Sequence, residues 1–131
     1  MKLKILAILF FLGSFNLAQA QDNSKSYNLL VFEGSDWCAN CIRFNTNVTS
    51  DSVFNHFLSE KNINLEFIDF PQRKTLEKSV RDYNASVAEK YNFKGVFPTI
   101  ILIDRRTDEY TFLNYSNENP KEFIALIASK M

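Results

Sequence analysis

The segment GSDWCANCIRF, residues 34–44, carries both cysteines and the only tryptophan of the 131-residue chain. It follows the mostly apolar run 27–32, which predicts a strand buried on both faces, and it predicts a helix beginning near Trp37 or Cys38. At that position unpaired backbone N–H groups and the helix dipole favour a Cys38 thiolate. Cys41 lies three residues further on and shares the same helix face. The spacing therefore predicts an attacking thiol and a resolving thiol.

Two other uses of the cysteines fit the sequence less well. A structural zinc site needs four ligands. The chain offers two cysteines and one histidine, His56, so a carboxylate would have to be the fourth ligand. Structural zinc sites usually have more cysteines than this. No metal is predicted, and His56 is interpreted as a surface residue. A bridge that closes only four residues removes about 2 kcal/mol of unfolded-state entropy, against about 4.7 for a 100-residue loop. A bridge placed for stability would span more chain.

Apolar residues at helical spacing predict three further helices. One is capped by Asp51 or Ser50 and is either a new helix or a continuation of the first after a kink. The last has a marked start, because Asn119 can cap it, Pro120 suits its first position and Glu122 can complete a capping box. These helices are predicted over residues 51–61, about 75–91, and from 120 onward.

Runs rich in β-branched and aromatic residues predict three more strands, the last two as a hairpin. They are predicted over residues 63–70, 97–104 and 110–114. The order β, α, β, α, β, β, α predicts a three-layer α/β/α sandwich with a mixed four-stranded sheet. Strands separated by helices are expected to pair in parallel, and the hairpin strands antiparallel.

The N-terminus predicts export. Residues 1–20 contain Lys2 and Lys4, an apolar run and a small-residue cleavage pattern ending at Ala20, which is typical of a signal peptide. A membrane anchor would need a longer uninterrupted apolar run. The remaining domain, residues 21–131, has 13 basic and 15 acidic side chains, so no nucleic-acid partner is predicted. Export places the cysteines where disulfides persist.

Taken together, the strand, the DWCANC segment that opens a helix, and a later FPT before a hairpin resemble the thioredoxin superfamily. The resemblance covers residues 27–131 and is closest to small exported thioredoxin-like proteins and to domains of periplasmic disulfide-interchange reductases. It implies that Cys38 is the nucleophile and Cys41 the resolving thiol. It also implies a minimal core, because the extra N-terminal strand and helix of full thioredoxins have no counterpart here.

The resemblance further implies a substrate-binding role for three residues. Pro98 matches the family's cis-proline, and the backbone of Phe97 before it can pair with an extended substrate strand. The alternative for Pro98 is an ordinary proline at the start of a strand. Trp37 offers an apolar surface beside the nucleophile, or merely packs there.

Departures from the family pattern bear on the chemistry. Many thioredoxins place a buried Asp six residues before the nucleophile, where this chain has Phe32. The neighbouring Glu33 is a candidate proton relay, but strand alternation points it to the opposite face. Its alternative is a solvated carboxylate at the strand end. Asp36 and Arg43 are interpreted as charges that oppose and favour the thiolate, or as solvated surface groups.

The predicted function is an exported thiol-disulfide oxidoreductase, periplasmic or secreted. Ala39 and Asn40 between the cysteines provide no cation to stabilise the thiolate, which favours a reductase. No cofactor is implied. The expected partners are protein disulfides and a redox partner protein, either bound to the membrane or not. The protein is expected to be a monomer. The alternatives are a disulfide oxidase or isomerase, and a redox-inert thioredoxin-fold module that binds peptides.

Overall fold

A computed structural model describes residues 26–131 of the chain. The predicted signal peptide, residues 1–20, lies outside the described residues. A four-stranded sheet forms the centre, with the strands in the order β2-β1-β3-β4. Its strands are β1 (Tyr27–Glu33), β2 (Ile63–Asp69), β3 (Thr99–Asp104) and β4 (Tyr110–Leu113). The predicted mixed sheet is confirmed.

The direction of β3 corrects one prediction. β1 and β2 are parallel, as expected for strands joined through helices, but β3 pairs antiparallel with β1, with Thr99 opposite Phe32. The chain between α3 (Lys78–Lys90) and β3 returns to the carboxyl end of β1, so β3 starts where β1 finishes. A helix between two strands leads to parallel pairing only when it brings the chain back to the end of the sheet at which the first strand begins.

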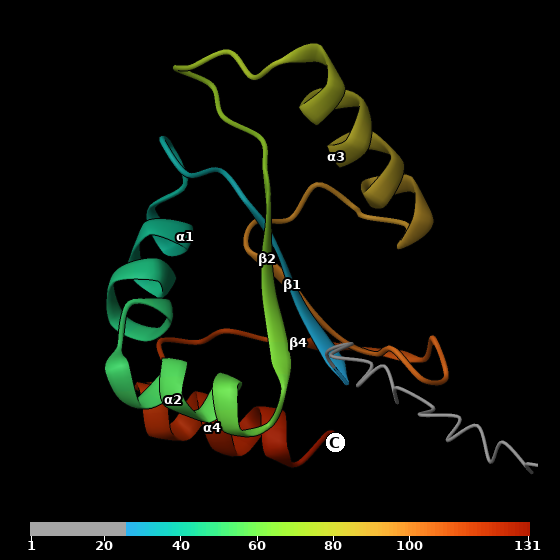
Figure 1. Ribbon diagram of the computed structural model, residues 1–131. Helices are drawn as coiled ribbons and strands as arrows, with labels where there is room; N and C mark the ends of the chain where they lie inside the picture. The colour runs from blue at the N-terminus through green and yellow to red at the C-terminus, as the bar shows by residue number, and fades with distance from the viewer. Residues whose placement is uncertain (1–25) are drawn as a thin grey trace, which may run out of the picture.

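Helices cover both faces of the sheet (Figure 1). One face carries three of them, and α3 alone covers the other. The three are α1 (Ala39–Phe44), α2 (Ser52–Glu60) and α4 (Pro120–Ala128). Alternate residues of β1 supply the two cores: Leu29 and Val31 pack under the three helices, whereas Leu30 and Phe32 pack on the α3 side. All four are at most 1% exposed, as the apolar run predicted.

The second helix is separate from the first. After α1 the chain forms a π-helix, η1 (Asn45–Thr49), in which Ser50 N donates to Asn45 O. Asp51 then adopts an extended conformation and its side chain accepts from Val53 N and Phe54 N. Of the two predicted caps, the structure uses Asp51, and the capping box of α4 is also present as predicted.

Helix α3 begins later than the pattern predicted, at Lys78 and not near residue 75. The backbone N–H groups of Gln72, Arg73 and Lys74 donate to the carboxylate of Asp36. This lead-in is therefore held by a contact with another segment. No helix within residues 26–131 is long and apolar enough to cross a membrane.

Candidate functional site

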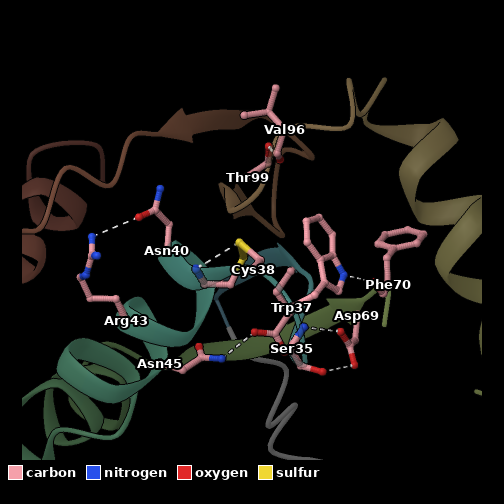
Figure 2. The surroundings of a disulfide bond; sticks show 12 residues. Ser35, Trp37, Cys38, Asn40, Arg43, Asn45, Asp69, Phe70, Val96 and Thr99 are labelled. Atoms are coloured by element: carbon pink, nitrogen blue, oxygen red, sulfur yellow. Dashed lines mark hydrogen bonds between the residues drawn. A yellow bond between two sulfur atoms is a disulfide. The ribbon is translucent and has the colours of Figure 1, made fainter. Parts of the chain in front are cut away.

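Cys38 and Cys41 form a disulfide at the start of α1. Cys38 is the N-cap residue, and its sulfur accepts a hydrogen bond from Cys41 N at 3.2 Å (Figure 2). An N–H group directed at this sulfur also favours the thiolate once the bridge is reduced. Cys38 is 7% exposed and Cys41 is 1% exposed. Cys38 is therefore the more accessible of the two cysteines. The assignment of Cys38 as nucleophile and Cys41 as resolving thiol stays a prediction.

Trp37 and Phe97 lie together beside this disulfide. Their rings meet edge to face, with centroids 5.1 Å apart, and the peptide bond between Phe97 and Pro98 is cis. Trp37 Nε1 donates to Phe70 O at 2.8 Å, so the polar edge of the indole is satisfied inside the protein. A side chain at Gly34 would overlap the indole ring, so only glycine fits below it. The three residues predicted to bind substrate are thus gathered at one end of the sheet.

Seven hydrogen bonds, which we call the loop clasp, join residues 33–37 to residues 69–74. Ser35 donates to Asp69 through its N–H at 2.9 Å and its hydroxyl at 2.6 Å (Figure 2). Phe70 N donates to Glu33 O at 2.8 Å. The remaining four are the Trp37 bond and the three backbone donors to Asp36.

Asp36 is therefore a bound carboxylate, in contrast to the solvated charge considered from the sequence. Its oxygens accept from Gln72, Arg73 and Lys74 at 2.9, 2.8 and 3.1 Å. Hydrogen bonds from these N–H groups, the one from Gln72 most of all, lower the pKa of Asp36. Ser35, Asp69 and Phe70 have no sequence signal that marks them as part of a site, because their contacts cross from one segment to another.

Glu33 is buried, with 6% of its surface exposed. Asn45 Nδ2 donates to Glu33 Oε2 at 2.6 Å, and Asn45 follows Cys41 by one helical turn, its N–H donating to Cys41 O. Burial raises the pKa of Glu33, more than the bond from Asn45 lowers it. Alternation does turn Glu33 away from the Phe32 face, but the face it reaches is the one that α1 covers. It is not a solvated carboxylate.

Phe32, at the position where the predicted resemblance would place an acid, belongs to an aromatic cluster. It is fully buried, stacks on Phe93 with centroids 4.4 Å apart and lies 6.5 Å from Phe70. The rings of Phe93 and Phe70 both contact the ring of Phe97, with centroid distances of 5.1 and 5.9 Å. The surroundings of Phe32 are therefore apolar and continuous with the wall beside Trp37.

Arg43 and His56 take no part in this arrangement. Arg43 donates to Asn40 and Asn117 at the surface, and His56 lies on α2 beside Glu60, with 73% of its side chain exposed. Among residues 26–131, no group of three His, Cys, Asp or Glu side chains could hold a metal ion.

No family model matches the sequence. The chain is 26% identical over 117 residues to the disulfide bond reductase DsbH of Chlamydia pneumoniae, covering 87% of this chain and 69% of that protein. The solved structure of a DsbH oxidoreductase is similar with a TM-score of 0.72 and 24% identity, covering 80% of this chain and 72% of that one.

Two more distant solved structures share the same arrangement. The oxidised C-terminal domain of DsbD from Neisseria meningitidis has a TM-score of 0.55 and 12% identity, with 81% of both chains covered. A thioredoxin from Thermus thermophilus has a TM-score of 0.53 and 16% identity, covering 79% of this chain and 72% of that one. At these identities the likeness concerns the fold.

Proposed function

We propose that this chain, a thiol-disulfide oxidoreductase of the thioredoxin superfamily, reduces disulfides in exported proteins. The observation that carries the proposal is the Cys38–Cys41 pair, with the more exposed sulfur at the N-cap of α1 beside Trp37. The name of the DsbH relative, a disulfide bond reductase, supports the reducing direction. So does the absence of a cation at Ala39 and Asn40 between the cysteines.

The reaction begins from the reduced dithiol. The Cys38 thiolate attacks one sulfur of a substrate disulfide, forms a mixed disulfide and releases the other substrate sulfur as a thiolate, which takes up a proton. Cys41 then loses its proton and attacks the Cys38 sulfur, which expels the second substrate thiolate. Two electrons pass to the substrate, and the enzyme ends as the Cys38–Cys41 disulfide.

Glu33 is the proposed acceptor of the Cys41 proton. Its carboxylate lies under the same helical segment as Cys41, held by Asn45 one turn further on. A pKa raised by burial brings a carboxylate closer to the pKa of a thiol, which is the condition for efficient general base catalysis. In this chain Glu33 would take the role that an acid at position 32 has elsewhere in the family.

Trp37, Phe97 and Pro98 are the proposed substrate contacts. The paired rings of Trp37 and Phe97 offer an apolar wall beside Cys38, and the backbone of Phe97 would pair with an extended segment of the substrate. A disulfide in a flexible or unfolded segment fits such a wall more readily than one buried in a folded core.

Localisation and partner follow from the direction of electron flow. We propose that residues 1–20 direct export and that residues 21–131 act in the periplasm or outside the cell. A reductase in an oxidising compartment must be reduced again after each turnover. We therefore expect a redox partner protein, bound to the membrane, that delivers electrons to the Cys38–Cys41 disulfide.

The test is an equilibrium redox titration against glutathione, followed through the fluorescence of Trp37. A potential near about −270 mV supports a reductase, and one near about −120 mV identifies an oxidant. Cys38→Ser is the control that cannot form the bridge. A pair that never exchanges with glutathione contradicts the enzyme and leaves the peptide-binding module.

Trapping provides an independent check. Cys41→Ser should accumulate mixed disulfides through Cys38 because the second step is blocked. The double variant Cys38→Ser, Cys41→Ser should trap none. If Cys41→Ser also traps nothing from a mixture of oxidised proteins, the assigned roles are wrong.

A further inference from the structure

An exposed apolar surface continues from the redox site towards the edge strand. Val96, Phe112 and Tyr110 are 64%, 53% and 45% exposed, high values for large apolar side chains. We call these three residues the β4 shelf. They line a groove of about 360 Å³ together with Tyr91, Asn92, Phe93, Lys94 and Thr99.

The sheet register explains why the shelf is apolar. Phe112 is opposite Ile101 and Tyr110 is opposite Ile103, and both isoleucines belong to the core under α3. The shelf therefore extends that core face to the edge strand, where no element of the described chain covers it. The Tyr110 ring is fixed against Tyr91, with centroids 5.1 Å apart. A fixed aromatic surface loses little conformational entropy when a ligand binds.

The shelf is continuous with the surroundings of the disulfide. Val96 lies two residues before Pro98, and Thr99 Oγ1 donates to Val96 O at 2.6 Å. Val96 and Thr99 both belong to the surroundings of Cys38 drawn in Figure 2, and both line the groove. A polypeptide with its disulfide at Cys38 would thus pass over Val96 to reach Phe112.

The charge at the rim of the groove also favours one kind of occupant. Lys94 hydrogen-bonds the neutral side chain of Asn92 at 2.8 Å, whereas the neighbouring Lys90 is paired with Asp108. An occupant with a carboxylate next to an apolar residue would complement both Lys94 and the shelf.

We propose that the β4 shelf is a second recognition surface, which binds an extended segment of substrate polypeptide carrying aromatic or branched apolar residues and an acidic residue. The inference rests on the proposed function, because it assigns the segment to a disulfide substrate. It restricts the substrate class to flexible or unfolded polypeptides with apolar stretches. Small disulfides would react without touching the shelf.

The test compares two synthetic peptides of equal length, each carrying one cysteine as a mixed disulfide with glutathione. One contains Phe, Val and Glu, and the other has Ser, Ser and Gln at those positions. The purified protein, reduced again after each turnover by dithiothreitol and with the uncatalysed rate subtracted, should show a lower KM for the first peptide. Phe112→Thr should raise that KM about tenfold with kcat within about twofold, as expected for the loss of one buried aromatic contact.

Two matched variants sharpen the comparison. Lys94→Gln should raise the KM for the Glu-containing peptide a few-fold and remove most of its salt dependence. Val53→Thr changes a residue of α2 that is 52% exposed and outside the groove, so it should leave both peptides unaffected. The rate with glutathione disulfide should be equal in all variants. Equal KM values for the two peptides, or no effect of Phe112→Thr, would overturn the proposal.

A non-reacting version separates the shelf from the proposed chemistry. The apolar peptide with serine in place of cysteine carries a fluorescent label, and its binding is followed by anisotropy. Weaker binding to Phe112→Thr supports the shelf even if the protein reduces no disulfide. If the protein instead self-associates in sedimentation experiments and Phe112→Thr makes it monomeric, the shelf binds a second copy and the proposal is wrong.

Discussion

Glu33, which is buried, and Asn45, which is half-buried, form a hydrogen-bonded polar pair on the α1 side of the site. Burial raises the pKa of Glu33, so the folded protein keeps this proton at pH values where the unfolded chain has lost it. The stability that follows is fully present below the ordinary pKa of a glutamate and is lost as the pH rises through the raised value. Glu33 thus lowers stability at neutral pH, a cost that the proposed proton transfer would explain.

Glu33→Gln should reveal that cost. The amide cannot ionise but can still accept the bond from Asn45, so the variant should match the wild type in acid and exceed its unfolding free energy at neutral pH. Urea unfolding at a series of pH values measures the difference. The same variant should slow the decay of the mixed disulfide, provided that Glu33 accepts the Cys41 proton. A stability difference that stays constant with pH would show that folding does not shift the pKa of Glu33.

Phe32 is the other decisive residue, and an acid placed there should destabilise the fold. Phe32→Asp removes a fully buried ring that stacks on Phe93 and places a carboxyl group in the aromatic cluster. We expect a loss of at least about 3 kcal/mol in unfolding free energy. Phe32→Leu keeps the site apolar and should cost less than about 1.5 kcal/mol. An Asp variant as stable as the Leu variant would mean that water reaches this position.

At the scale of the elements, the loop clasp joins the approach to α1 with the approach to α3. Asp36→Ala removes the acceptor of three backbone N–H groups at once. We expect faster hydrogen exchange at Gln72, Arg73 and Lys74, and a change in the fluorescence of Trp37 next to the lost contact. Ser35→Ala is the matched variant, because it removes one clasp bond and leaves those three amides bound.

The clasp should also depend on pH. Its N–H donors lower the pKa of Asp36, so its contribution is present above the ordinary pKa of an aspartate and is lost as the pH falls through the lowered value. The exchange rates of wild type and Asp36→Ala should therefore converge in acid, after correction for intrinsic exchange. Slow exchange of the three amides in Asp36→Ala at neutral pH would show that the loop holds itself.

For the whole molecule, the relative stability of the two redox states reports the direction of the reaction. Linkage requires that a reducing dithiol have the more stable oxidised form, whereas a strong oxidant has the more stable reduced form. We expect the free energy of unfolding of the oxidised protein to exceed that of the reduced protein by up to about 2 kcal/mol. This is the contribution of the unfolded-state entropy that closing a four-residue loop removes. Urea unfolding with and without dithiothreitol measures it. Greater stability of the reduced form would identify an oxidant.

Features that depend on a local pattern of residues can be predicted from the amino-acid sequence. Three features act within a few residues, so their residue types predict them: the apolar run of β1, the cap at Asn119 and the Cys38–Cys41 spacing. For α2 the sequence left the cap between Asp51 and Ser50, and the structure uses Asp51. Two predictions from the sequence were wrong: the residue at which α3 begins and the direction of β3. Helix α3 begins at Lys78, after a lead-in whose residues 72–74 are bound by Asp36. Strand β3 runs antiparallel to β1 because the chain before it returns to the carboxyl end of β1.

The surroundings of the disulfide, in contrast, depend on contacts between segments that are distant in the sequence. Asp36 and Asp69 look like surface charges in the sequence, yet each completes the clasp with a segment more than 30 residues away. Glu33 is recognisable as a candidate acid, but its burial and its bond to Asn45 follow from how α1 packs on β1. The β4 shelf is exposed because β4 is an edge strand. Such properties depend on which distant segments meet, and residue types along the chain do not encode that pairing locally.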